Sequence, residues 1–387
     1  MAGLLFARAG VETLVLEKHA DFLRDFRGDT VHPSTLELFD QLGLLDELLA
    51  LPHDRVESIS AQIAGQLVEI ADFRRLKTVA PFIAMMPQWD LLNFISANAQ
   101  RYPSFTLRTQ AEAVGTITDD TDQVRGVKLA DGSRIDADLV IAADGRGSVL
   151  RQSAQLPLER LGAPMDVFWL EIPKSGKGTA FGVFENNRIL ILIDRGTYWQ
   201  CGFVFAKGEG ERIKQRPFAE FQAMLIETAP VLAKGVETLS GWDSANLLSV
   251  SLDRLSTWHK PGLLAIGDAA HAMSPIGGVG INLAIQDAVA AANILAAPIA
   301  NGDDPDPLLH KVQERRWKAV VKTQKLQKLV QDRMIEPMVS GRAAMRKPPL
   351  PLRLLNAIPS LRRFPAQIIG LGFARERIEA PDIHDLG

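Results

Sequence analysis

Runs of apolar residues that end near a carboxylate recur along the chain and predict buried strands of an α/β fold. The clearest runs are residues 11–16, 139–143 and 263–266, and Glu17, Asp144 and Asp268 follow them. Continuous apolar runs of this length are typical of parallel strands that are covered on both faces. We therefore expect a parallel sheet with carboxylates at the ends of its strands.

Helical periodicity alternates with these runs. Residues 3–9 have the pattern of a helix end, and Gly10 suits its C-terminal cap. Further helices are predicted at residues 29–49, 88–100, 280–297 and, after Pro305, to about residue 339. Alternating strand and helix patterns of this kind favour an open α/β sheet.

The pattern changes between residues 156 and 250, where aromatic and β-branched runs at 167–170, 189–193 and 198–205 predict an antiparallel sheet. This sheet would form a second domain. We accordingly divide the chain into 1–155 (first part of the first domain, with an inserted strand pair at about 54–85), 156–250 (second domain), 251–300 (second part of the first domain) and 301–387 (C-terminal helical segment).

Composition removes several classes of function. The 387 residues carry a formal net charge of −3, which gives no global attraction to nucleic acid. The single cysteine, Cys201, excludes a disulfide framework or a cysteine metal cluster, and the seven histidines lack metal-ligand spacing. We find no apolar run of about 20 residues that would predict a membrane span. A cytoplasmic protein without a metal is expected.

Residues 263–288 carry the strongest candidate chemistry. A strand ends at Asp268, glycines 277, 278 and 280 follow, and a helix then begins. The carboxylate can accept a hydrogen bond from a sugar or ribityl hydroxyl, and glycines allow close approach to a planar ring. A helix N-terminus favours an anion such as a reduced flavin. The order of these parts favours a flavin-binding loop over a ligand-free glycine-rich turn.

This segment resembles the Gly-Asp motif of flavoprotein aromatic hydroxylases of the p-hydroxybenzoate hydroxylase type. The resemblance implies a Rossmann-like FAD-binding domain joined to an antiparallel substrate domain. It also implies that FAD contacts the residues at the matching positions: Asp268, Pro275, Gly280, Ile281 and Asn282.

Other segments agree with this family. Residues 138–151 resemble its Asp-Gly motif, which gives Asp144 a role at FAD, although Asp-Gly is also an ordinary turn. Glu17 suits the adenosine ribose hydroxyls, with a surface acid as the alternative. Arg27 resembles an arginine that reaches the cofactor, with a salt-bridged surface residue as the alternative. Gln88 has a similar place in the family, and both its cofactor role and a structural role stay open.

The beginning of the chain departs from the family pattern. The dinucleotide fingerprint G-x-G-x-x-G follows a first strand, and Ala2-Gly3 matches only its last two positions. We expect the first strand and two glycines to be missing because of a truncated gene model, with weaker FAD binding as the consequence.

The resemblance implies an oxidoreductase in which NAD(P)H reduces FAD, and O2 then forms a flavin hydroperoxide that hydroxylates a small phenol-like aromatic substrate. Tyr198 is the candidate proton relay, against a packed core tyrosine as the simpler interpretation. His271 is assigned to a structural hydrogen bond rather than to a relay.

Three alternatives remain from the sequence. A flavin halogenase would need a paired-tryptophan signature, and residues 168–173 hold one tryptophan. A flavin reductase or dehydrogenase of the same fold would insert no oxygen, and a degenerate flavoprotein would have no activity. For the helical region 320–338 we expect packing on the FAD domain or a homodimer contact rather than membrane binding.

Overall fold

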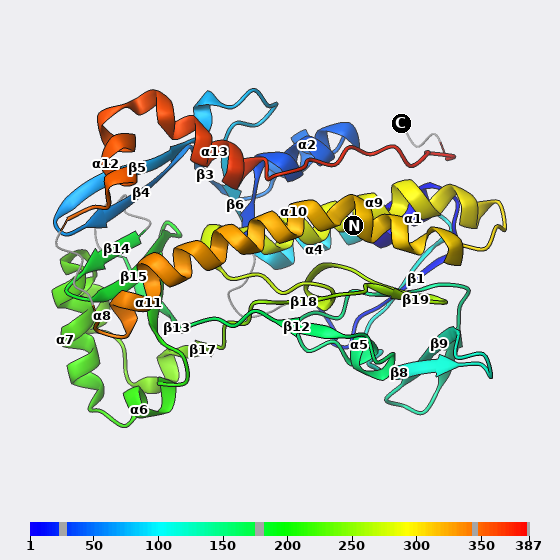
Figure 1. Cartoon of the computed structure of the whole chain (residues 1–387), viewed down its shortest axis with the longest axis horizontal. Coiled ribbons are helices and arrows are strands. Elements are labelled where there is room, and N and C mark those ends of the chain that lie inside the picture. Colours follow the sequence, from blue (N-terminus) through cyan, green and yellow to red (C-terminus); the bar gives the residue numbers. More distant parts are fainter. Residues whose placement is uncertain (23–28, 175–181, 343–346, 385–387) are drawn as a thin grey trace.

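The computed structural model describes residues 1–22, 29–174, 182–342 and 347–384. Two long helices, α9 (Gly280–Ala300) and α10 (Leu309–Val330), pack against each other along the middle of the molecule (Figure 1). A large sheet lies at one end, and the small hairpin strands lie at the other. The predicted mixed α/β architecture is confirmed.

The parallel strands belong to two separate small sheets among the described residues. Strand β1 (Thr13–Leu16) pairs with β7 (Phe105–Arg108), and β11 (Val140–Ala142) pairs with β20 (Leu263–Ala265), which β19 (His259–Lys260) flanks. The prediction that β1 is buried is wrong, because β7 is its only described strand partner and Leu14 is 41% exposed. The expectation of a missing strand stays a prediction.

Most predicted helices are present. Helix α1 (Ala2–Arg8) is followed by Gly10 at φ +84°, the left-handed conformation expected of a C-terminal cap. Helix α4 (Gln88–Ala99) also matches its pattern, and α10 continues through a π-helical turn (Gln331–Ile335) into α11 (Glu336–Val339). Helix α10 packs on α9, whereas α11 packs on β15 and β16, and α12 and α13 pack on β5.

The strands of the predicted substrate domain belong to a seven-stranded sheet in the order β17-β13-β16-β15-β14-β4-β5. The inserted strand pair belongs to this sheet, because β4 pairs with β14. The bounds are β4 (Ser58–Ile63), β5 (Gln66–Asp72), β13 (Met165–Pro173), β14 (Gly182–Glu185), β15 (Arg188–Asp194), β16 (Tyr198–Ala206) and β17 (Asn246–Leu248).

The two faces of this sheet have different neighbours. Phe168, Cys201 and Phe203 pack under α7 (Phe218–Thr228) in one hydrophobic cluster. The opposite face packs against α11 and against Ile276 of the 263–288 segment in another cluster. We call this second face the substrate face; its central residues are Val167, Trp169, Ile191, Gln200, Gly202 and Val204.

The remaining elements complete the chain. A three-stranded sheet joins β2 to β6 and β3 beside the substrate domain. The other described bounds are β2 (Thr30–Val31), α2 (Pro33–Gln41), α3 (Leu45–Ala50), β3 (Asp54–Val56), β6 (Ile83–Met85), β8 (Ala113–Thr118), β9 (Val124–Leu129), β10 (Arg134–Asp136), α5 (Val149–Ser153), β12 (Leu158–Arg160), α6 (Gly210–Lys214), α8 (Ala233–Val236), β18 (Asp253–Leu255), α12 (Leu350–Ala357) and α13 (Arg363–Gly370).

One helical stretch, Ile276–Ala300, is long and apolar enough to cross a membrane by length and composition, which the sequence patterns did not indicate. More than half of its most apolar window is buried inside the structure. Helix α9 packs against α1 and α10, so burial in the protein core accounts for its apolar character.

Candidate flavin site

The segment 263–288, here called the flavin loop, folds as a strand, two short turns and a helix. Strand β20 leads into a 3-10 turn at Gly267–Ala269, and a second turn at Ile276–Gly278 precedes α9. Gly278 has φ +62°, and a Cβ there would lie 2.4 Å from Oγ1 of Thr30. Both the backbone conformation and the close approach therefore require glycine at this position.

Asp268 lies beside the first turn of α9. A Cβ on Gly280 would lie 3.9 Å from Oδ1 of Asp268, and about a third of the Asp268 side chain is exposed. Nε of Arg146 donates to Oδ2 of Asp268 over 2.9 Å. No side chain caps the start of α9 among the described residues, so its first amides can bind an anion.

These groups fit FAD by their chemistry. The carboxylate of Asp268 accepts hydrogen bonds from hydroxyls, and the α9 amides suit the negative charge of a reduced flavin. Nη1 of Arg146 is buried and has no hydrogen-bond partner among the described residues, which leaves one more donor beside Asp268. The donor set and the glycine backbone together are compatible with a flavin.

Two predicted motifs meet at this place. Strands β11 and β20 are parallel neighbours with Ala142 opposite Ala265, which brings the segments after them together. Arg146 belongs to the first motif and binds Asp268 of the second. Asp144 accepts from Oγ of Ser148 at 2.5 Å and from the amide of Leu150 at 3.2 Å, so its carboxylate stabilises the start of α5.

Asn282 is buried, and its side chain has partners on both amide atoms. Oδ1 accepts from the backbone N–H of His32 at 2.9 Å and from Oγ1 of Thr35 at 2.7 Å. Nδ2 donates to the carbonyls of Thr30 and Gly278. The side chain thus joins the flavin loop to the segment around β2, and its predicted contact with FAD stays a prediction.

The other predicted cofactor residues are more dispersed. Pro275 precedes the second 3-10 turn, and Ile281 lies half-buried in the first turn of α9. Glu17 follows β1 and accepts from the amide of His19 at 2.9 Å; within the described residues β1 has no strand pairing to the β11–β20 sheet. Gln88 is the first residue of α4. Arg27 lies outside the described residues.

A buried ion pair that the sequence did not indicate joins the two domains. Nη2 of Arg195 donates to the carboxylate of Asp29, and its Nε donates to Oε1 of Gln200 at 3.0 Å. Burial raises the pKa of Asp29, and the charge of Arg195 and the Gln88 backbone amide partly offset this rise. These residues are far apart in the chain and share no motif, so no sequence signal could have found the contact.

Tyr198 and Trp169 lie on the strands of the substrate face. Tyr198 begins β16, and burial followed by the negative charge of Glu171 raises its pKa, which keeps it a neutral phenol near pH 7. A Cβ on Gly202 would lie 3.0 Å from the ring of Trp169, so glycine leaves room for that ring. The indole N–H of Trp169 is buried and has no hydrogen-bond partner among the described residues.

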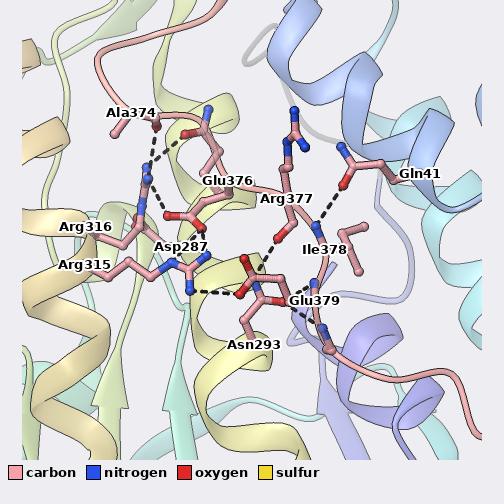
Figure 2. A network of polar contacts seen from close by, with 12 residues as sticks. Gln41, Asp287, Asn293, Arg315, Arg316, Ala374, Glu376, Arg377, Ile378 and Glu379 are labelled. Carbon is pink, nitrogen blue, oxygen red and sulfur yellow. Dashed lines mark hydrogen bonds and ion pairs between the residues drawn. The ribbon is translucent and has the colours of Figure 1, made fainter.

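A buried network of ion pairs and hydrogen bonds stabilises the flavin loop. Figure 2 shows its charged residues Asp287, Arg316 and Glu376. Oδ2 of Asp287 accepts from the Gly267 amide at 3.1 Å and lies 2.6 Å from Nε2 of His271. Nε of Arg316 donates to Oδ1 of Asp287 at 2.9 Å, and Nη1 of Arg316 to Glu376 at 3.2 Å. Burial would raise the pKa of Asp287, but His271 and Arg316 outweigh burial and lower it. The ring of His271 thus binds Asp287 of α9 and not the turn, and its structural role stays a prediction.

Glu376 belongs to residues 374–383, here called the C-terminal strap, which crosses the helices of the FAD-binding part. Figure 2 shows the strap beside α9, where Oδ1 of Asn293 accepts from the Glu379 amide at 2.8 Å. Arg315 binds Glu376 and Glu379. Sequence reasoning missed the strap because its partners come from helices more than fifty residues away in the chain.

Two glutamines of the long C-terminal helix also hold the flavin loop. Nε2 of Gln327 donates to the carbonyls of Ser274 and Ile276, at 2.9 and 3.0 Å. Nε2 of Gln331 donates to Oγ of Ser274 at 3.0 Å. Buried polar residues at this spacing in a predicted helix were the available signal for a contact with backbone.

Comparisons with known proteins agree with this site. The FAD binding domain family matches residues 1–325. The 6-methylpretetramide 4-monooxygenase of Streptomyces rimosus is 29% identical, over 93% of this chain and 86% of that protein.

Solved structures share the fold. PqsL of Pseudomonas aeruginosa superposes with a TM-score of 0.74 at 18% identity, over 88% of this chain and 94% of that one. The OxyS anhydrotetracycline hydroxylase of Streptomyces rimosus gives 0.70 at 22% identity, over 95% and 73%. Since the family match covers most of the chain and includes both motifs, the protein belongs to the FAD binding domain family, with the flavoprotein monooxygenases of the p-hydroxybenzoate hydroxylase type.

Proposed function

We propose that this flavoprotein uses NAD(P)H and O2 to hydroxylate a small phenol-like aromatic compound. The observation that carries the proposal is the position of the flavin loop against the substrate face, where Ile276 packs in one cluster with Trp169 and Ile191. An apolar wall with an indole N–H that has no partner in the described part of the chain suits an aromatic ring that bears an oxygen.

The residues of the chain would divide the work. Asp268, Arg146 and the first amides of α9 would hold the cofactor and favour its anionic reduced form. FAD, when bound, supplies hydride acceptance and the activation of oxygen. The apolar substrate face excludes water and orients the substrate, and the N–H of Trp169 donates to a substrate oxygen. Tyr198 keeps its proton near pH 7 because its pKa is raised, so it would donate a hydrogen bond rather than accept a proton.

The names of the relatives indicate which substrates to try first. One relative acts at position 4 of 6-methylpretetramide, and a structural neighbour is an anhydrotetracycline hydroxylase. The substrate face presents broad aliphatic side chains, among them Val167, Ile191 and Val204. We therefore propose polycyclic phenols as the first compounds of a substrate panel.

The test is NAD(P)H oxidation by the FAD-loaded protein with that panel, followed by mass spectrometry of the product. The proposed reaction converts substrate, O2, NAD(P)H and a proton to hydroxylated substrate, water and NAD(P)+. One oxygen atom from labelled O2 should enter the product. NAD(P)H consumption that yields only hydrogen peroxide with every compound would instead support the reductase alternative.

A further inference from the structure

The chain has one long segment without any acidic residue. Between Glu336 and Glu376 the basic residues are Arg342, Arg346, Lys347, Arg353, Arg362, Arg363 and Arg375, whereas the whole chain carries a net charge of −3. Helices α12 and α13 lie within this segment, at the end of the molecule where β4 and β5 lie (Figure 1). A concentrated positive region on an acidic protein indicates an anionic partner.

The same segment exposes large apolar side chains. Leu350, Leu354 and Ile358 are 65%, 46% and 45% exposed, and they follow each other at intervals of four residues. This spacing places Leu350 and Leu354 on one side of α12, and Ile358 follows directly after the last residue of the helix. Phe364, at the start of α13, is 47% exposed. No residue of α12 is fully buried, so most of its apolar surface faces outward.

Contacts with β5 and with Arg362 hold α12 in place. Leu352 and Leu355 are half-buried on the side of α12 that contacts β5. Arg362 binds Glu69 of β5 and donates from Nε to the carbonyl of Leu355 at 3.0 Å, which fixes the turn between α12 and α13. Arg353 and Arg363 are exposed and form no ion pair with any described residue. Two arginines therefore remain available beside these ordered apolar side chains.

We propose that α12, the turn after it and the start of α13 form a surface that docks on an anionic lipid bilayer. The exposed leucine, isoleucine and phenylalanine side chains of α12, of the turn after it and of α13 enter the boundary between headgroups and acyl chains. The flanking arginines bind lipid phosphates while their stems cover apolar surface. We call this surface the basic patch; it consists of Lys347, Leu350, Arg353, Leu354, Ile358, Arg363 and Phe364.

Charge disfavours the obvious alternative occupant, a second copy of the chain. In a twofold dimer through the basic patch, the same surface of both copies would meet. Arg353 and Arg363 would then face like charges, and the patch holds no carboxylate that could compensate them. An anionic bilayer offers complementary charge over the whole patch.

Vesicle flotation of the full-length FAD-loaded protein tests the proposal. The protein should float with vesicles of phosphatidylcholine mixed with phosphatidylglycerol at low salt, and not with pure phosphatidylcholine. Added salt should weaken the binding, because the Debye length falls to about 3 Å at 1 M. Failure to float with the mixed vesicles at low salt would overturn the proposal.

Paired variants assign the binding to the patch. The charge reversal R353E/R363E should weaken partitioning about 25-fold or more, since each basic residue near the surface contributes about 1 kcal/mol, close to fivefold. The matched control K128E/R134E reverses two exposed, cross-strand charges on β9 and β10 and should bind as the parent does. Equal loss in both variants would show general electrostatics and would contradict a docking surface.

A second pair of variants tests the apolar side chains of the basic patch. L354Q/I358Q should lose binding, whereas Leu14→Gln, at a residue 41% exposed on β1, should keep it. Thermal melting confirms that each variant is folded. If light scattering instead shows a dimer that L354Q/I358Q dissociates, the patch is a protein interface and the lipid proposal is wrong.

Discussion

The two walls of the candidate site are built in different ways. The flavin loop is one contiguous run, and its polar groups are held by protein partners: Asn282 by β2 and α2, Ser274 by Gln327, and the Gly267 amide by Asp287. The substrate face consists of alternate residues from β13, β15 and β16, and its Trp169 N–H has no described partner.

This difference indicates which of the two walls has a fixed structure before a ligand binds. A loop whose buried polar side chains mostly have partners presents the same shape to every cofactor molecule; among the described residues of the loop, Nδ1 of His271 is the buried side-chain atom without a partner. A wall with an unsatisfied donor gains a hydrogen bond only when a substrate supplies the acceptor. Substitutions behind the flavin loop should therefore lower stability, and substitutions on the substrate face should change substrate binding.

The largest effect is expected for Arg316→Met. The change removes the only arginine that pairs with the buried Asp287 among the described residues, whereas Glu376 keeps Arg315, and it should lower the free energy of unfolding by about 3–5 kcal/mol in urea titrations. Arg315→Met is the matched control, because Arg315 is partly exposed and Glu376 keeps Arg316; a loss of about 1 kcal/mol or less is expected. Similar losses for both variants would contradict a special role of the buried pair.

A pH effect of about 3 kcal/mol is expected from His32, whose backbone N–H binds Asn282. Burial lowers the pKa of His32 to about 4 from 6.5. The unfolded chain then binds more protons than the folded one, so stability is full above pH 6.5 and is lost as the pH falls toward 4.

Urea titrations at several pH values measure this slope. His32→Gln should flatten it, and His310→Gln, at an exposed histidine, should leave it unchanged. An unchanged slope in His32→Gln would show that other groups cause the acid sensitivity.

Asp268→Asn tests the binding of FAD by the flavin loop itself. Loss of a charged acceptor should cost about 1.5–3 kcal/mol, which raises the Kd for FAD by roughly 10- to 100-fold in a flavin fluorescence titration. Asp136→Asn, at an exposed strand end, is the control. A normal Kd for Asp268→Asn would remove this residue from the cofactor site.

The smallest effect is expected on the substrate face. Trp169→Phe removes one neutral donor and should raise KM by up to about tenfold, from about 0.5–1.5 kcal/mol, with the Kd for FAD unchanged. Trp199→Phe removes an equivalent buried N–H on the opposite face and should leave KM as it is. If Trp199→Phe changes KM equally, the effect is one of sheet stability.

The sequence predicted the flavin loop because a strand, a carboxylate, glycines and a helix follow each other within 263–288. It predicted the antiparallel substrate sheet from its aromatic and β-branched runs. It did not predict which face of β16 meets the flavin loop, because facing depends on register, and a shift of one residue exchanges Gln200 for Trp199. The contacts of Asp29 with Arg195 and of Arg316 with Glu376 depend on packing between distant segments.

The C-terminal strap has a consequence for biosynthesis. The ribosome synthesises Gly267, Asp287 and Arg316 before Glu376. The contacts of Asp287 with Gly267 and Arg316 can therefore form in the nascent chain before Arg316 can bind Glu376. The strap also closes on the first helix, where Nε of Arg8 donates to Asp382 at 3.0 Å and the Ile383 amide to the Arg8 carbonyl at 3.2 Å. Arg8 and Asp382 lie 374 residues apart in the sequence, so the contact between α1 and the strap can form only after the strap has been synthesised.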